Sequence, residues 1–400
     1  MNTVKKIYSR AFHFVMRALI PLFPYRELEL LDGLDAAVDV LKKKDISGVM
    51  LVTDRGVRGL GLTEPLEKLI TERGIELTVY DGTMPNPTSE NVECARSLYL
   101  ENDCQSLIAF GGGSAMDCAK AVGARIARPN TPLDKMAGLI RVRRRLPTFI
   151  AIPTTAGTGS ETTVASVITD ALTHRKYVIN DFCLIPHYAL LDPDVTLGLP
   201  RHLTATTGMD ALTHAVEAYI GKSRTGATKV AAETAVKLIF ENLERSYEVG
   251  TDREARRNML HASYLAGTAF TKSYVGYVHA VAHTLGGKYG VAHGLANAVL
   301  LPKVLRAYGT SVTKPLAALA RASGLADATL SDDEARELFI SYVEGMNMRM
   351  SIPESLECIK KEDIPAMALL ADKEANPLYP VPTLWDATEL ERLYYLIVTD

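Results

Sequence analysis

Two pairs of chemically active side chains are spaced for one face of a helix. His279 and His283 lie four residues apart, and Asp210 and His214 repeat that spacing upstream. Side chains four residues apart point to the same side of a helix. With His293 added, the set offers one carboxylate and several imidazoles without a thiolate, which suits Fe²⁺, Zn²⁺ or another first-row ion. Each pair alone is equally typical of structural histidines, but together they predict a divalent-metal site.

The elements that carry these residues divide into two kinds. Residues 34–127 alternate short apolar runs with helix-like runs, and a further apolar run follows at 148–152, which predicts a parallel sheet. After about residue 195 the pattern is helical almost throughout, from 204–219 to 364–371. We therefore predict an α/β N-terminal dinucleotide-binding domain (1–195, parallel sheet with helices on both faces) and an all-α C-terminal metal-binding domain (196–400).

Two local predictions concern helix continuity. The run from Leu60 to Arg73 reads as one helix. Further along, Leu285-Gly286-Gly287 breaks the periodicity that places His279 and His283 on one face, so we expect that helix to end there.

Bulk properties exclude several function classes. A length of 400 residues favours two domains, and a net charge of −3 gives no electrostatic reason to bind nucleic acid. The five cysteines are scattered without a C-x-x-C motif, which fits reduced thiols and a cytoplasmic location. We take a homodimer as the default assembly.

Residues 1–30 form an N-terminal extension with an apolar run at 11–23. The run is too short to span a bilayer, Arg17 and Pro21 interrupt it, and no cleavage signal follows, so we expect no integral membrane segment. An amphipathic helix lying on the protein body or at a subunit contact is favoured, with a peripheral membrane anchor as the alternative.

Three features near strand ends could bind a dinucleotide. Gly111-Gly112-Gly113-Ser114 joins a buried run to a helix, where bare N–H groups suit a pyrophosphate, although G-x-G-x-x-G is absent and a plain turn is as good an interpretation. Asp54 ends another run and could accept from a ribose hydroxyl, which favours NAD over NADP, or could simply cap a turn. The segment 153–161 (PTTAGTGSE) is rich in small polar residues and favours a nucleotide crevice.

A bound ion in the helical domain would act as a Lewis acid on a carbonyl or an alkoxide. Combined with a nicotinamide, that chemistry becomes hydride transfer.

The motifs PTTAGTGSE, TGMDALTHAVEAY, HAVAHTLGG and HGLANAVLLP together resemble the iron-containing (group III) alcohol dehydrogenase family, over nearly the whole chain from about Gly33. The resemblance implies an active site in the cleft between the two domains, with Asp210, His214, His279 and His293 as metal ligands. It leaves His283 beside the substrate as a proton-relay or positioning group, and it makes Phe270 a wall of the substrate pocket. The implied cofactor contacts are Asp54, Asn86, Gly112, Gly113, Ser114, Asp117, Thr154, Thr155, Thr158 and Lys176.

The sequence departs from the family pattern just after Phe270. The segment TKSYVGYVHA stands where the family commonly has a smaller segment rich in Asn and Gly. Lys272, Tyr274 and Tyr277 would therefore narrow or polarise the pocket, so the identity of the alcohol is left open.

Our leading hypothesis is an NAD(H)-dependent alcohol dehydrogenase or aldehyde reductase that uses Fe²⁺, with Zn²⁺ or another divalent ion possible, and acts on a small-molecule alcohol or aldehyde. The rival is a dehydroquinate-synthase-like or glycerol-dehydrogenase-like enzyme that uses Zn²⁺ and NAD. A helical scaffold with purely structural histidines is the non-enzymatic alternative.

Overall fold

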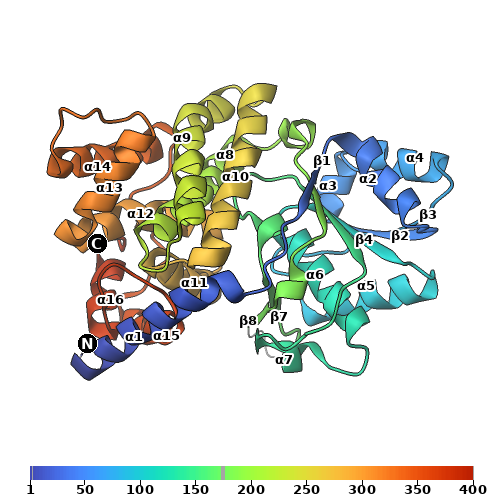
Figure 1. Ribbon diagram of the computed structural model, residues 1–400, viewed down its shortest axis with the longest axis horizontal. Coiled ribbons are helices and arrows are strands. Elements are labelled where there is room, and N and C mark those ends of the chain that lie inside the picture. The colour runs from blue at the N-terminus through green and yellow to red at the C-terminus, as the bar shows by residue number, and fades with distance from the viewer. Residues whose placement is uncertain (2, 173–175, 400) are drawn as a thin grey trace. The chain divides into compact units, whose positions relative to one another are not determined.

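The computed structural model describes residues 1, 3–172 and 176–399 (Figure 1). The chain forms two compact units, one of residues 24–197 and one of residues 1–23 together with 198–400. The two units meet in the sequence at residues 197 and 198. The first 23 residues group with the helical unit, whereas the sequence-based division placed them with the α/β domain.

The α/β unit is built on a six-stranded sheet in which every pair of neighbours is parallel, in the order β1-β9-β6-β4-β2-β3. These strands are β1 (Glu29–Leu31), β2 (Gly48–Val52), β3 (Glu76–Tyr80), β4 (Ser106–Gly111), β6 (Thr148–Pro153) and β9 (Tyr188–Leu190). A second sheet has the order β5-β8-β7, from β5 (Gly138–Leu139), β7 (Ala165–Thr169) and β8 (Lys176–Asn180).

Helices cover both faces of the six-stranded sheet, as Figure 1 shows. Alternate residues of a strand point to opposite faces, so Val49 and Leu51 pack with α2 (Gly33–Lys43) and α4 (Glu64–Glu72). The intervening Met50 and Val52 pack in a second core with two other helices. These are α5 (Ser89–Glu101) and α6 (Gly113–Ala127). The parallel sheet with helices on both faces confirms the predicted fold class. The class was predictable because the central strands of a sheet that is buried on both faces are wholly apolar.

The prediction of one helix over 60–73 is wrong. A short helix α3 (Arg55–Gly59) ends before a turn, and α4 begins only at Glu64. Gly61 has a φ of +73°, a left-handed conformation that a continuous helix excludes, and Pro65 lies in the first turn of α4, where its missing N–H costs nothing.

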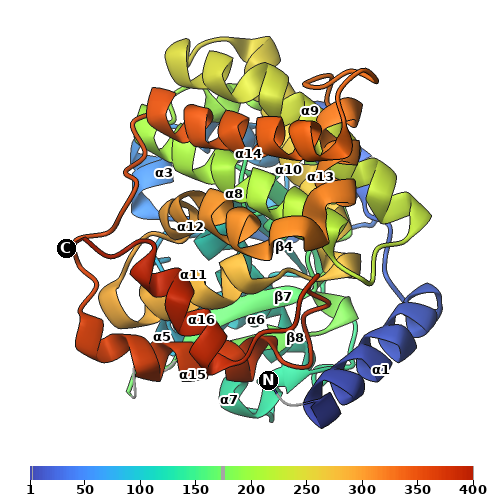
Figure 2. The ribbon, with the colours of Figure 1, turned by 90° about the vertical axis from the view of Figure 1, so that its left-hand side faces the viewer.

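The second unit is helical, and among residues 198–399 the structure contains no named strand. Helices α8, α9 and α10 pack on one another, and α12 packs on α8 (Figure 2). Its helices are α1 (Thr3–Leu19), α8 (Arg201–Ile220), α9 (Gly226–Glu248), α10 (Arg253–Ser273), α11 (Tyr277–Tyr289), α12 (His293–Tyr308), α13 (Thr313–Ala322), α14 (Asp332–Arg349), α15 (Ile364–Ala375) and α16 (Ala387–Tyr395). Among the described residues, none of the helices combines the length and apolar character that crossing a bilayer requires.

Helix α11 does not end at Gly286 and Gly287, so that prediction is also wrong. The helix continues to Tyr289 and ends at Gly290, whose φ of +70° is the left-handed conformation that closes many helices. Glycine inside a helix costs only about 1 kcal/mol relative to alanine, and tertiary packing readily offsets that.

A buried lysine fixes the segment that follows β6. Lys120, on α6, is fully buried, and its Nζ donates to the carbonyl oxygens of Ser160, Thr163 and Ala165 at 2.7–2.9 Å and to the Thr163 hydroxyl at 2.7 Å. Burial lowers the pKa of Lys120. The ammonium thus ties the segment 160–165 to α6, close to the predicted nucleotide-binding residues.

We expect Lys120→Met to lower the free energy of unfolding by about 2–3 kcal/mol, because several buried carbonyls would lose their donor. Urea unfolding measures the change. Lys43→Met, at an exposed lysine of α2 in the same unit, is the matched control and should change stability by less than about 0.5 kcal/mol. Equal effects of the two substitutions would contradict the role assigned to Lys120.

Candidate metal centre

Helix α8 carries the first part of the centre on one of its faces. Asp210, His214 and Glu217 are all buried, and their spacing of four and three residues aligns them. The stretch Gly208–Ile220 of α8 is buried throughout, so these polar groups lie inside the helical unit. Buried polar groups need partners, and theirs come from α11 and α12.

The four predicted metal-binding side chains lie together. Asp210, His214, His279 and His293 each offer one ligand atom, and these atoms all lie within 4.8 Å of one another. The Asp210 carboxylate is 3.5 Å from His293 Nε2 and 3.9 Å from His279 Nε2. Three of the four are buried, and His293 is partly exposed. Helices distant in sequence therefore deliver one carboxylate and three imidazoles to a single point.

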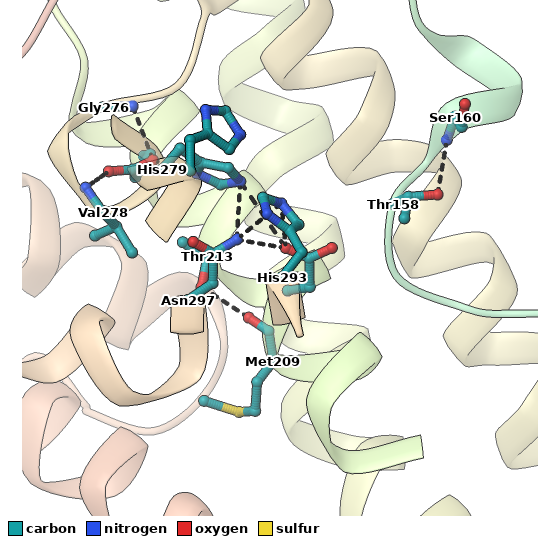
Figure 3. A network of polar contacts seen from close by, with 12 residues as sticks. Thr158, Ser160, Met209, Thr213, Gly276, Val278, His279, His293 and Asn297 are labelled. Atoms are coloured by element: carbon teal, nitrogen blue, oxygen red, sulfur yellow. Dashed lines mark hydrogen bonds and ion pairs between the residues drawn. The ribbon is translucent and has the colours of Figure 1, made fainter. Parts of the chain in front are cut away.

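Hydrogen-bond acceptors in this cluster outnumber the hydrogens that face them. Asn297 Nδ2 donates to Asp210 Oδ1 at 2.7 Å and lies 3.1 Å from His279 Nε2 and 3.2 Å from His293 Nε2. With both Nε2 atoms unprotonated, one amide group offers two hydrogens to three acceptors, while the buried Asn297 Oδ1 has no hydrogen-bond partner among the described residues. Figure 3 shows His279, His293 and Asn297 turned toward one another. A buried set of acceptors that is short of hydrogens fits a divalent cation.

Glu217 holds the His279 ring. Its carboxylate accepts from His279 Nδ1 at 2.6 Å and from the backbone N–H groups of Gly276 and Val278 at 2.8 Å each, at the start of α11 (Figure 3). With the proton on Nδ1, the Nε2 lone pair of His279 faces the cluster, as a metal ligand requires. The same carboxylate supplies acceptors to the first turn of α11, where negative charge is favourable.

Burial sets the protonation of both partners. It raises the pKa of Glu217 to about 7, although hydrogen bonds from the backbone N–H groups of Gly276, Val278 and His279 act in the opposite direction. Burial, followed by the charges of the neighbouring imidazoles, keeps the pKa of His279 well below its usual value. His279 is therefore neutral near pH 7, the form that binds metal.

His283 lies beside the cluster but outside it. Its ring stacks on His293 with centroids 5.2 Å apart, and its side chain is 42% exposed. Its Nδ1 is 2.6 Å from Glu374 Oε1, which also accepts from the Tyr379 hydroxyl at 2.7 Å. A carboxylate therefore orients His283 as Glu217 orients His279.

Phe270 stacks on His214 with ring centroids 4.1 Å apart and is partly exposed. Lys272 and Tyr274 follow at the end of α10, where Tyr274 adopts a φ of +65°. A positive φ is unfavourable for a tyrosine and marks a backbone constrained by its surroundings.

In the α/β unit, the predicted cofactor residues gather where β2, β4 and β6 end. A Cβ at Gly112 would lie 3.4 Å from Thr155, and a Cβ at Gly113 would lie 3.0 Å from Thr158. The turn after β4 and the segment after β6 can therefore approach each other this closely because the turn consists of glycine. The Thr154 N–H donates to the Gly111 carbonyl at 3.0 Å.

Other predicted cofactor residues join the same edge. Lys176 Nζ donates to Asn86 Oδ1 at 2.7 Å, and the Asn86 N–H donates to the Ser114 hydroxyl at 3.3 Å. The Asp117 carboxylate accepts from the Ser160 hydroxyl at 3.3 Å. The carboxyl edge of a parallel sheet is the usual place for a nucleotide.

Asp54 has the capping role that the sequence left open. Its Oδ1 accepts from the Val57 N–H at 2.9 Å as the N-cap of α3. Its other oxygen lies on the side of Gly111, 3.6 Å from where a Cβ of that residue would be.

Comparisons with known proteins agree with this geometry. A profile described as "Iron-containing alcohol dehydrogenase" matches residues 32–193, and one described as "Fe-containing alcohol dehydrogenase family, C-terminal" matches 204–395. A 1,3-propanediol dehydrogenase of Klebsiella pneumoniae is 40% identical over 331 residues, 82% of this chain and 85% of the relative. This chain belongs to the iron-containing alcohol dehydrogenase family.

Two further comparisons extend the similarity. An NAD-dependent methanol dehydrogenase of Bacillus methanolicus is 36% identical over 330 residues, 82% of this chain and 86% of the relative. The crystal structure of a 1,3-propanediol oxidoreductase has a TM-score of 0.88 at 35% identity, and the match covers 93% of this chain and 97% of that one. The family resemblance stated from the sequence motifs is confirmed.

Sequence reasoning about this iron-containing alcohol dehydrogenase homologue missed three residues of the centre. Glu217 had a usable signal, since it continues the helix face of Asp210 and His214. Asn297 had a similar signal, four residues after His293. Glu374 had none, because it lies 91 residues from His283 in the sequence.

Gly294 offers a test of how α12 positions His293. A Cβ at Gly294 would lie 2.4 Å from the Thr206 carbonyl oxygen of α8, a backbone atom that cannot turn aside. We expect Gly294→Ala to displace the start of α12 and lower the affinity for Fe²⁺ or Zn²⁺ at least tenfold, at a stability cost of about 1–3 kcal/mol. Metal content after equilibration with buffered free ion measures the loss.

Gly287→Ala is the matched control, because Gly287 is also helical and a Cβ there meets nothing within 4 Å. It should keep full metal content. Unchanged affinity in Gly294→Ala would show that the close approach of α8 and α12 does not position His293.

Glu217→Gln tests the second support of the centre. We expect about a 10–100-fold weaker metal affinity, since glutamine has one acceptor oxygen for three N–H groups and does not fix the His279 tautomer. Titration with Zn²⁺ against a competing chelator gives the value. Glu241→Gln, at an exposed residue of α9, should bind normally, and normal binding by both variants would refute the positioning role.

Proposed function

We propose that this protein is an NAD(H)-dependent alcohol dehydrogenase or aldehyde reductase that uses Fe²⁺, with Zn²⁺ or another divalent ion as a substitute. The observation that carries the proposal is the convergence of one carboxylate and three imidazoles, with ligand atoms within 4.8 Å, in a chain of the iron-containing alcohol dehydrogenase family. The NAD dependence of the related methanol dehydrogenase supports the choice of cofactor.

Asp210, His214, His279 and His293 would hold the ion. Bound together, a divalent ion and a nicotinamide supply Lewis-acid stabilisation of an alcohol oxygen and a hydride acceptor. Asp210 provides the negative charge of the set. Glu217 keeps His279 in the tautomer with Nε2 free to bind, and the packing of α12 on α8 holds His293 at the same point.

His283 would move the proton. Its contact with Glu374 leaves the Nε2 atom as an acceptor when Nδ1 carries the hydrogen, and its 42% exposure gives it access to water. The ring can therefore take a proton from an alcohol beside the cluster and release it to solvent. Tyr379, which donates to Glu374, keeps that carboxylate in place.

The substrate would be a small alcohol or aldehyde bounded by Phe270, Lys272 and Tyr274. The stacking of Phe270 on His214 supports its role as a pocket wall. A lysine and a tyrosine in this segment favour substrates with a second polar group over purely apolar ones.

The dinucleotide would bind to the α/β unit at the ends of β2, β4 and β6. The pyrophosphate fits the N-terminus of α6, where the Gly112 and Gly113 backbone is uncovered by side chains. The proposed contacts are Asp54, Asn86, Gly112, Gly113, Ser114, Asp117, Thr154, Thr155, Thr158 and Lys176. The negative charge of Asp54 would disfavour the 2′-phosphate of NADP.

We also propose a cytoplasmic location and a homodimer. Five unpaired cysteines support a reducing compartment. The dimer rests on the general frequency of twofold assemblies among soluble enzymes.

An anaerobic assay of the Fe²⁺-loaded protein with short primary alcohols, diols and aldehydes, run with NAD and NADP in parallel, tests the function. We expect net NADH formation from an alcohol and a lower kcat/KM with NADP. His279→Ala should lose bound metal and at least about 100-fold of the turnover while still binding NADH, since the metal-binding set would lose one of its three imidazoles and the Lewis-acid chemistry would go with the ion.

His261→Ala, at an exposed histidine of α10, is the matched control and should keep metal and activity. Full activity in metal-free His279→Ala would overturn the metal role. Consumption of a phosphorylated substrate without net NADH formation would instead favour the dehydroquinate-synthase-like alternative.

A further inference from the structure

Helix α1 packs on the helical unit with its polar side inward. Ser9 and His13 are each only 3% exposed. His13 Nε2 donates to the Pro377 carbonyl at 2.7 Å, and Arg10 donates to the Val381 and Pro382 carbonyls at 2.7 and 2.6 Å. Hydrogen bonds to the backbone of residues 377–382 therefore fix the rotation of this helix about its axis.

The opposite side of α1 is apolar and faces water. Val4, Ile7, Phe14 and Val15 are 53–76% exposed, and Leu22 just beyond the helix is 77% exposed. Together with Tyr8, Ala11, Ala18 and Leu19, they recur at spacings of three, four and seven residues and form one stripe. In a helix that rests on a protein body, the apolar side normally faces the body. Here the helix is held in the reverse orientation, and a contiguous exposed apolar surface of this kind marks an interaction site.

The charge around the stripe is of one sign. Helix α1 contains four basic residues and no acidic residue, and the first acidic residue of the chain is Glu27, although the whole protein carries a net charge of −3. Lys5 and Arg17 are exposed and border the stripe on its two sides, and Lys6 is exposed further round the helix. A basic amphipathic helix with aromatic and aliphatic residues on its apolar side is typical of segments that lie in the headgroup region of an anionic membrane.

We propose that the apolar stripe of α1 docks the protein on an anionic lipid surface, with the helix parallel to the membrane plane. The apolar side chains enter the headgroup boundary, and the long basic side chains reach the lipid phosphates from both flanks. This surface lies outside the ranges that match the two family profiles, so it is an addition to the enzyme rather than part of its site.

A second copy of the chain fits this surface less well. Twofold pairing of two α1 stripes would bring Lys5, Lys6 and Arg17 of one copy toward the same residues of the other, with no acidic partner on either helix. Anionic headgroups supply the opposite charge that a second copy lacks.

Co-flotation of the full-length protein with lipid vesicles tests the proposal. We expect binding to vesicles of phosphatidylglycerol and phosphatidylcholine, at least tenfold weaker binding to phosphatidylcholine alone, and weakening as salt is raised. The double variant Ile7→Gln, Phe14→Gln should lose at least tenfold of the binding, and Lys6→Gln, Arg17→Gln should lose most of the preference for the anionic lipid.

Leu369→Gln, at a leucine of α15 that is 62% exposed, is the matched control and should bind vesicles like the parent. Alcohol oxidation and thermal unfolding should be unchanged in all these variants, which separates lost docking from lost folding. Absence of binding to anionic vesicles, or binding that survives in the Ile7→Gln, Phe14→Gln variant, would overturn the proposal. If the protein self-associates without lipid and the Ile7→Gln, Phe14→Gln variant does not, the stripe binds a second copy of the chain. That result would also overturn the proposal.

Discussion

Buried lone pairs that converge on one point repel each other, and the helical unit is arranged around that constraint. Asp210, His279 and His293 direct potential ligand atoms at a common centre, and the Asn297 amide lies among them. Holding such a set requires rigid supports outside it. Helix α8 is buried from Gly208 to Ile220, and Glu217 joins it to the start of α11 through three hydrogen bonds. The cation that the set attracts would turn a destabilising cluster into a stabilising one.

The residues that gather in the cluster were predictable from the sequence, whereas the contacts that hold them in place were not. Spacing of four residues brought Asp210 and His214 onto one face, and the order of long motifs related them to His279 and His293. The contact between His279 and Glu217 spans 62 residues, and that between His283 and Glu374 spans 91. Local patterns carry no information about such contacts, which only the packing of α8, α11 and α15 creates.

The two errors in local structure came from opposite readings of glycine, which was taken as a helix end at residues 286 and 287 and as a helical residue at position 61. Gly286 and Gly287 were expected to end a helix, yet they lie inside α11 and Gly290 ends it; at residue 61 a glycine does interrupt the chain. What differs is the backbone conformation, since only Gly61 and Gly290 adopt positive φ. Composition shows that a left-handed turn is allowed at each of these positions, but tertiary packing decides where it occurs.

The short link between α10 and α11 restricts how substrate specificity and metal affinity can change separately during evolution. It begins at Tyr274, with its unfavourable φ, and ends at Gly276, whose N–H binds the carboxylate that holds His279. Replacements in this link that reshape the proposed substrate pocket would also shift the N–H groups at the start of α11. Substrate range and metal affinity would then not vary independently, so a new specificity arising here would need a compensating change near Glu217. Phe270, which lies one helical turn earlier on α10, offers a route to altered specificity that leaves the link intact.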